Sequence, residues 1–213
     1  MQAQHHRQPA HALHDAPTVR LDDLAPIATL VGEQAVSRRR DVQQRHERFH
    51  VQLFIDTLNK RHRSNFQVIS EPNPPEAIIK SAGTTRWVEV VTAYWNHAYA
   101  QDLNSYATEG ETHKSVGNGV FMNMDSEFAQ NFVASVQNKL EKSSDDSTRD
   151  KYGPGYLVVP VLFPFFGRDT LRFMQQEWRN RSLKDRGCFR SIYLTYQVWD
   201  KYVVSLWRPK SEA

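Results

Sequence analysis

Residues 46–50 read HERFH and match the H-E-x-x-H pattern of zinc proteases. In that pattern two imidazoles one helical turn apart bind zinc, and the glutamate activates water. The extended form of the motif needs glycine and histidine where this chain has Leu53 and Asp56. Glu71 has nearly the spacing of the other common third ligand, but the prolines of EPNPPE exclude the helix that would carry it. We therefore expect the two histidines to be ordinary residues of a helix surface and rank a zinc protease third.

Two glutamates on neighbouring strands form a second candidate site. The segments PEAIIK (75–80) and TRWVEVV (85–91) have strand character, and SAGT between them is a plausible hairpin turn. A hairpin that closes at the centre of SAGT places Glu76 opposite Glu89, with Cβ atoms about 5 Å apart. Facing carboxylates need either a cation between them or one shared proton. We expect a divalent cation, Mg²⁺ or Mn²⁺.

Side-chain alternation and a third acidic residue help to decide whether Glu76 and Glu89 form a metal site. On the second strand of the hairpin, Val88 and Val90 are expected to face the core and Glu89 the opposite side. The alternative is that the opposite side is a solvent-facing edge with incidental glutamates. Glu47 argues against that alternative, because it lies seven residues before Phe54, on the apolar face of the preceding helix. A carboxylate there needs a compensating charge.

The order of these features resembles the PD-(D/E)XK nuclease superfamily, which has the restriction-endonuclease-like fold. The match spans about residues 41–163 and includes PPEAII and RWVEVV. The resemblance implies an α/β core of helix, three strands, helix and strand that hydrolyses phosphodiesters with Mg²⁺ or Mn²⁺. By position, Glu76, Glu89 and the Val90 carbonyl would bind the metal. Glu47 would be an auxiliary ligand or would orient the attacking water.

The chain departs from the pattern of this superfamily at two positions. Glu76 stands where the superfamily has aspartate, and Val91 stands where it has a lysine. That lysine orients water and stabilises charge on the phosphate, which valine cannot do. Lys139 is the candidate replacement, because it lies within the apolar stripe of a helix expected at 126–142, and Lys142 is the second candidate. The alternative is that Lys139 snorkels past the edge of the sheet.

The whole chain predicts a mixed α/β fold with a central sheet between helices. Residues 1–37 are expected to form a flexible tail with a short helix near 21–36, and residues 38–213 a single nuclease-like domain. The connection at 93–125 receives no prediction, and 143–155 is expected to be a surface loop. The elements expected besides the hairpin are a helix at 39–60, a strand at 66–72, a helix from an Asp125 N-cap to Lys142, a strand at 156–163, a helix at 168–183 and a C-terminal β-hairpin.

Charge and composition bear on partners and location. The net charge is +3, and basic residues cluster at two places, near Arg45 and along the helix expected at 168–183. In the second cluster Arg168, Arg172 and Arg179 would position a nucleic-acid backbone. A solvated helix face is the alternative.

The chain offers no sign of secretion or membrane insertion. Cys188 is the only cysteine, so an intrachain disulfide is excluded, and the longest apolar run is too short for a bilayer. We expect a cytoplasmic protein without a membrane partner, and a homodimer or larger complex remains open. The leading hypothesis is a metal-dependent endonuclease acting on DNA. The second is a catalytically inactive module of the same fold that binds nucleic acid or a protein.

Overall fold

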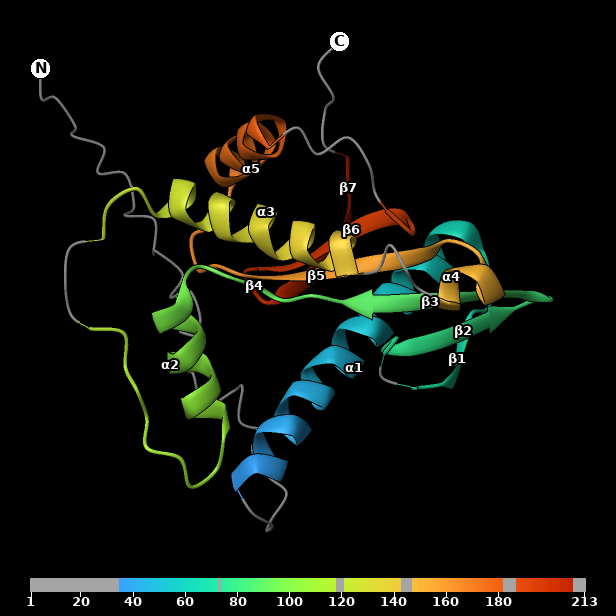
Figure 1. The fold of residues 1–213 in the computed structure, drawn as a ribbon, viewed down its shortest axis with the longest axis horizontal. Coiled ribbons are helices and arrows are strands. Elements are labelled where there is room, and N and C mark those ends of the chain that lie inside the picture. Colours follow the sequence, from blue (N-terminus) through green and yellow to red (C-terminus); the bar gives the residue numbers. More distant parts are fainter. Residues whose placement is uncertain (1–34, 73, 118–120, 143–146, 182–186, 209–213) are drawn as a thin grey trace, which may run out of the picture.

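The computed structural model of the chain describes residues 35–72, 74–117, 121–142, 147–181 and 187–208. These residues form five helices and seven strands in a mixed α/β arrangement (Figure 1). The tail predicted at 1–37 and the short helix predicted near 21–36 lie almost entirely outside the described residues. Only their last residues are described, and these begin α1 (Ala35–His62).

The strands form one mixed sheet. Its order is β1-β2-β3-β5-β6-β7, and the short β4 (Ala93–Tyr94) pairs with β5. Strands β3, β5 and β6 run parallel to one another, whereas β1–β2, β2–β3 and β6–β7 are antiparallel pairs. The other strands are β1 (Gln67–Ser70), β2 (Ala77–Ser81), β3 (Thr84–Val90), β5 (Gly155–Leu162), β6 (Phe189–Val198) and β7 (Lys201–Trp207).

The β2–β3 hairpin has the predicted register. Ile78 pairs with Trp87, and the turn closes at Ala82 and Gly83, whose φ angles are +43° and +80°. Both angles lie in the left-handed region that two-residue hairpin turns require. Continued by one pair, this register sets Glu76 level with Glu89, as the sequence predicted.

Helices cover both faces of the sheet. On one face α1 packs Phe54 and Ile55 against a cluster that includes Val88 and Val90. On the other face α3 (Met124–Lys142) covers a second cluster that includes Trp87. The prediction of a single core face on β3 was therefore incomplete, because the side that carries Glu89 is buried as well. Glu89 itself is only 3% exposed.

Two helices were not predicted, and one helix begins differently from its prediction. Helix α2 (His97–Ala107) fills part of the unassigned connection, and Asn96 caps it by accepting a hydrogen bond from the Tyr99 amide. The short α4 (Ser147–Tyr152) occupies the segment expected to be a loop. Asp125 is not an N-cap but lies inside α3, where its carboxylate accepts a hydrogen bond from the Thr170 hydroxyl.

The remaining helix, α5 (Arg168–Asn180), packs beside α3, and the C-terminal hairpin of β6 and β7 forms as predicted (Figure 1). Within the described segments, no helix combines the length and the apolar character needed to cross a bilayer.

Candidate acidic site

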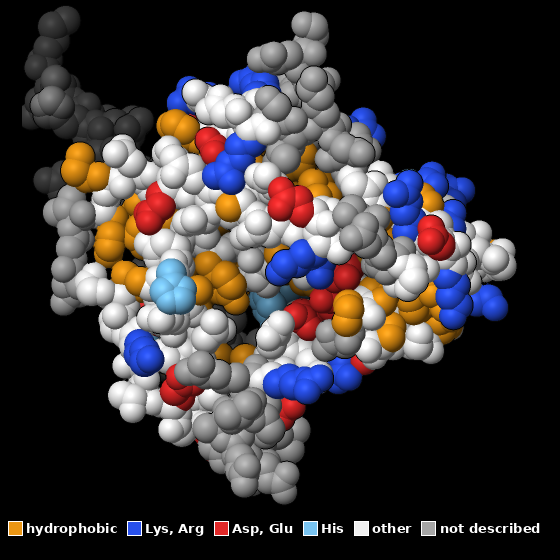
Figure 2. All heavy atoms as spheres, in the orientation of Figure 1, with side chains coloured by type: hydrophobic (Ala, Val, Ile, Leu, Met, Phe, Trp, Pro, Cys, Tyr) orange, Lys and Arg blue, Asp and Glu red, His pale blue; other side chains and the backbone are white. Residues whose placement is uncertain are grey.

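Four charged side chains from separate elements meet at the open end of the β2–β3 hairpin. Glu47 comes from α1, Glu76 from the residue before β2, Glu89 from β3 and Lys139 from α3. Figure 2 shows acidic side chains gathered near the middle of the face, over the junction of β3 and α1, beside a hollow. These are the four residues that were predicted from the sequence to be catalytic, and we name them the acidic site. Their proximity is a feature of the structure, whereas their catalytic role remains a prediction.

Lys139 and Glu89 form an ion pair within the acidic site. The Lys139 Nζ lies 2.5 Å from the Glu89 Oε2, and the two side chains are 23% and 4% exposed. Burial lowers the pKa of Lys139, but Glu89, Glu76 and Glu47 together outweigh this effect and raise it. The ammonium group is therefore held in its charged form beside three carboxyl groups. Lys142, the second candidate, is exposed on the same helix.

Glu76 is the most strongly perturbed carboxyl group of the acidic site. Burial, a hydrogen bond with the Glu89 carboxyl and repulsion by its charge together raise the pKa of Glu76 to about 9. The Oε2 of Glu76 accepts a hydrogen bond from the Val90 amide at 3.0 Å. A pKa of about 9 means that Glu76 keeps its proton at neutral pH, and a proton is one of the two solutions expected for facing acids.

Glu47 completes the acidic site from the opposite layer. Its Oε1 accepts a hydrogen bond from the Gln43 amide at 2.7 Å. Burial raises the pKa of Glu47, the bond from Gln43 and the charge of Lys139 oppose that rise, and Glu89 adds to it. The charges of Glu89 and Lys139 thus act on a carboxyl group of α1 across the end of the hairpin.

Val91, where the resemblance would place a lysine, belongs to the apolar core. Its side chain is half-buried and packs against the cluster under α3. Its amide donates to the Val158 carbonyl at 3.1 Å, which continues the pairing of β3 with β5. Positive charge at this end of the strand therefore comes from α3, as the sequence suggested for Lys139.

The acidic site has a donor set suited to one hard cation that keeps waters. Among the described residues, no group of three or more His, Cys, Asp or Glu side chains is arranged to hold a metal ion. Mg²⁺, however, is usually bound through one or two carboxylates together with water and substrate phosphate. The carboxyl groups of Glu76 and Glu89 match that smaller requirement. A cavity of about 40 Å³ adjoins Glu76 and is lined by Gln44, Glu47, Arg48, Val51, Glu71 and Glu76.

The two histidines of HERFH are not surface residues, which corrects the sequence prediction. His50 is 3% exposed, and its Nδ1 lies 2.8 Å from the Thr195 hydroxyl. The Nε2 of half-buried His46 lies 3.2 Å from the Thr92 hydroxyl. Burial lowers the pKa of His46 to about 4, and burial together with His46 lowers that of His50 to about 3. Both rings are neutral at pH 7, and each contacts a threonine: His50 contacts Thr195 of β6, and His46 contacts Thr92 between β3 and β4.

Glu71 does not join these histidines as a third zinc ligand. Its carboxylate pairs with Arg48, with 2.7 Å between Oε2 and Nη2. Both imidazoles of the proposed zinc site thus have hydroxyl partners, and the candidate third ligand is paired with an arginine. This arrangement argues against the zinc-protease hypothesis.

Tyr94 and Thr92 were not among the site residues predicted from the sequence, although Tyr94 lies within reach of the Glu47 charge and Thr92 contacts His46. Burial raises the pKa of Tyr94, hydrogen bonds with Asn104 and Thr92 oppose the rise, and the charge of Glu47 adds to it. Both residues lie at the start of the connection that received no prediction. The WVEVV strand pattern directly before them was the one available signal, because residues just after a buried strand often reach the functional edge of a sheet.

The three arginines nominated for nucleic-acid binding lie on α5, which contacts a different part of α3. Arg168, Arg172 and Arg179 are exposed, and Arg172 pairs with Asp169 at 3.3 Å. Helix α5 borders a cavity with the first half of α3, where Gln130 lies. Nine residues of helix, or about 13 Å, separate Gln130 from Lys139. The structure does not bring these arginines to the acidic site, and their role in binding stays a prediction.

Comparisons with known proteins do not assign the chain to a family. No family model matches it, and neither does any curated protein or solved structure. A functional proposal therefore depends on the geometry of the acidic site.

Proposed function

We propose that this chain is a Mg²⁺- or Mn²⁺-dependent nuclease of the PD-(D/E)XK type that acts on DNA. One observation carries the proposal: the Glu76 and Glu89 carboxyl groups meet at the open end of a hairpin, and Lys139 reaches the same point from another layer. A buried acid, a half-buried acid and a lysine in one place are costly unless their charges are used or compensated.

The arrangement of the elements supports the proposal. Helix α1, strands β1 to β3, helix α3 and strand β5 follow one another, apart from the insertion of β4, α2 and α4. Strand β5 lies parallel to β3, and α1 and α3 cover opposite faces of the sheet. This order is similar to the restriction-endonuclease-like core implied by the resemblance, to which α5 and the β6–β7 hairpin are added.

Glu76 and Glu89, with the Val90 carbonyl, are the groups that would hold the metal. Glu76 would have to give up its proton to bind a divalent cation, because a carboxyl group binds metal in its ionised form. When bound, the ion polarises a phosphate oxygen and makes water a stronger nucleophile at neutral pH.

The other two residues of the acidic site, Lys139 and Glu47, would stabilise charge and orient water. Lys139 places an ammonium group beside Glu89, where it can stabilise negative charge that grows on the phosphate. Glu47 has a raised pKa and lies at the cavity next to Glu76, so its carboxylate can orient the attacking water and accept its proton.

One observation favours a second function, a module of the same fold that binds without cleaving. Val91 fills the usual lysine position with an apolar contact, and the ammonium group of Lys139 already neutralises Glu89. In such a module the acidic site would contribute only to the stability of the fold.

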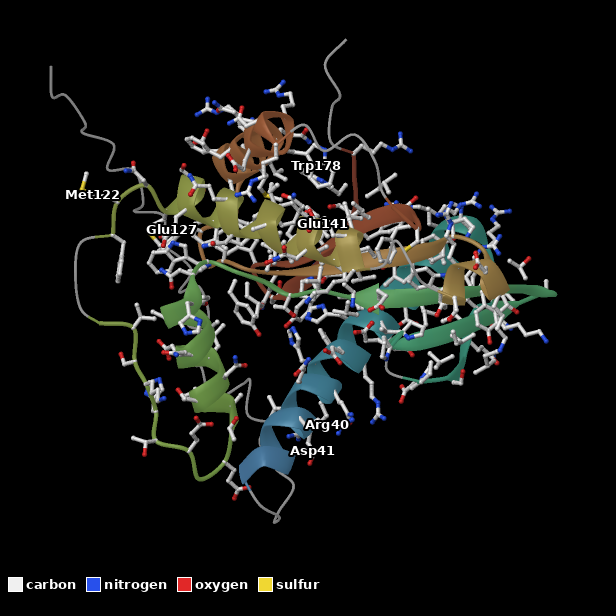
Figure 3. All side chains as sticks on the ribbon, viewed as in Figure 1. Arg40, Asp41, Met122, Glu127, Glu141 and Trp178 are labelled. Carbon is white, nitrogen blue, oxygen red and sulfur yellow. The ribbon has the colours of Figure 1, made fainter. Side chains whose placement is uncertain are left out.

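Plasmid cleavage with Mg²⁺ or Mn²⁺ separates these two functions. Glu89→Gln keeps the size of the buried side chain, and Glu141→Gln is the matched control, because Glu141 is exposed on the helix that carries Lys139 (Figure 3). We expect cleavage by the wild type and by Glu141→Gln, and a loss of at least 100-fold in Glu89→Gln. Cleavage that persists unchanged in a folded Glu89→Gln protein would exclude the acidic site as the catalytic centre. The absence of cleavage by the wild type would favour the binding module.

A further inference from the structure

Three exposed aromatic side chains lie at or beside the β6–β7 turn, and we name them the aromatic surface. Trp199 is 88% exposed in the β6–β7 turn, Tyr202 is 40% exposed on β7, and Phe49 is 42% exposed on α1. The rings of Phe49 and Tyr202 pack edge to face, with centroids 4.9 Å apart. The other four tryptophans of the chain are at most 4% exposed. Trp199 is thus the single tryptophan of this protein that faces solvent.

The backbone at Trp199 shows that its side chain is retained against a conformational cost. Val198 pairs with Lys201, so Trp199 and Asp200 form a two-residue turn. Trp199 has a φ of +56°, a conformation that such turns usually assign to Asn, Asp or Gly. Its carbonyl accepts a hydrogen bond from the Gln197 side-chain amide at 2.9 Å, which holds the turn in place. A bulky, solvent-facing indole in this position contributes nothing to the core, and its ring is open to contact with a ligand.

Basic residues flank the aromatic surface. Arg45 precedes Phe49 by four residues on α1 and therefore lies on the same side of the helix. Lys201 is exposed directly below the turn, opposite Val198. Aromatic rings interleaved with cations are the feature by which proteins bind single-stranded nucleic acid: bases stack on the rings, and the cations follow the phosphates.

Helix α1 connects the acidic site to the aromatic surface. Strands β3, β5 and β6 are parallel, and their register sets Glu89 level with Ile192, so Trp199 lies seven residues, or about 23 Å, further along the same direction. Helix α1 lies between the two places, because Glu47 belongs to the acidic site and Phe49 to the aromatic surface. A strand of nucleic acid that follows α1 can therefore contact both.

We infer that the aromatic surface binds unpaired nucleotides of a single-stranded DNA segment next to the acidic site. This inference rests on the proposed function and refines its substrate from DNA in general to DNA with an unpaired strand. Trp199 stacks on a base, Tyr202 and Phe49 extend the stacking surface, and Arg45 and Lys201 accompany the backbone.

Binding without metal tests this inference independently of cleavage. An oligothymidylate and a duplex of equal length are titrated in EDTA, and tryptophan quenching by acrylamide is followed. We expect the oligothymidylate to shield Trp199 from acrylamide. Trp199→Asn should weaken oligothymidylate binding by about 5-fold to 150-fold, the range for loss of one stacked base, and change duplex binding less than about twofold.

Two variants control for folding and for loss of apolar surface. Asparagine suits the left-handed turn, so Trp199→Asn removes the ring without harming the hairpin. Ile69→Ala removes an exposed apolar side chain from β1, at the other end of the strand order, and should leave binding unchanged.

Each result has one meaning for the aromatic surface. The inference is overturned if Trp199 stays as accessible to acrylamide with the oligothymidylate as without it. It is also overturned if Trp199→Asn binds the oligothymidylate as tightly as the wild type. A change of oligomeric mass in Trp199→Asn, without a change in oligothymidylate affinity, would mean that a second copy of the chain covers this surface. Plasmid cleavage without these binding effects would support the nuclease proposal and contradict the inference about the aromatic surface. The binding effects without plasmid cleavage would support the aromatic surface as a binding site and contradict the nuclease proposal.

Discussion

Lys139 on α3 and Glu89 on β3 form an ion pair with 2.5 Å between Nζ and Oε2, and the carboxylate is almost fully buried. The pair links the helix that covers one face of the sheet to the hairpin beside the second acid, half-buried Glu76. It is therefore placed to contribute both to stability and to the proposed chemistry, and variants at these positions separate the two contributions.

Removing the Lys139 side chain should damage both activity and stability. Lys139→Ala leaves a buried carboxylate without its cation, so we expect the free energy of unfolding to fall by about 3 kcal/mol. Cleavage of plasmid DNA should fall by at least about 100-fold. Lys142→Ala, on the exposed side of the same helix, should change stability by less than about 0.5 kcal/mol and leave cleavage intact. Urea unfolding and kcat/KM measure the two effects, and an active Lys139→Ala protein would contradict the role proposed for this lysine.

A lysine returned to the strand should restore part of what Lys139→Ala loses. Val91 lies two residues after Glu89 and packs on the α3 side of the sheet, so Val91→Lys would direct its ammonium group toward the space left by Lys139. We expect the double variant to cleave at least about tenfold faster than Lys139→Ala alone. Cleavage assays at equal fractions of folded protein provide the comparison. A double variant no faster than the single one would argue that Lys139 acts only in stability.

Stability should fall as pH rises from about 5 to 9 because of Glu76. Its folded pKa is about 9 against an ordinary value of 4.5, so between these values the folded state holds a proton that the unfolded state has lost. The free energy of unfolding then decreases by up to about 1.4 kcal/mol per pH unit. Glu76→Gln should flatten this dependence, and Mn²⁺ should reduce it in the wild type by replacing the proton. Thermal melts between pH 5 and 9, with and without Mn²⁺, measure both effects, and a wild-type profile as flat as that of Glu76→Gln would disprove the proton held by Glu76.

The buried histidines predict the opposite trend at lower pH. The folded pKa values of His46 and His50 are about 4 and about 3, below the ordinary 6.5, so the unfolded state gains protons first as pH falls. Stability is thus lost below about pH 6.5. His50→Phe should shift the midpoint of acid unfolding to lower pH, whereas the same change at exposed His62 should not. Circular dichroism across pH 3 to 7 follows the transition. Equal midpoints for the two variants would refute this account.

We expect Trp199 in the β6–β7 turn to lower the stability of the fold. Trp199→Asn replaces a bulky residue at a φ of +56° with one that tolerates the left-handed region, so we expect a gain of about 1 kcal/mol. Trp199→Phe should show no gain, because phenylalanine meets the same steric restriction. Urea denaturation of the three proteins decides the matter. A loss of stability in Trp199→Asn would show that the indole supports the fold.

Patterns set by near neighbours in the chain were predictable from the sequence. The turn at Ala82 and Gly83 sets the register of the β2–β3 hairpin, because two-residue loops admit few backbone shapes, and this register brings Glu76 to Glu89. The apolar stripe of α3 likewise indicated that Lys139, and not Lys142, points inward. These features depend on periods of two and 3.6 residues, which a sequence displays directly.

Features that depend on contacts between distant segments appeared only once the layers were assembled. His50 resembled a surface residue until β6 supplied Thr195 as its partner, and Glu89 resembled one side of an exposed edge until α3 covered it. The proximity of Tyr94 to Glu47 and of Phe49 to Tyr202 has the same origin. Burial and charge pairing arise from packing between elements, and no local period of residues specifies which helix will cover which face of the sheet.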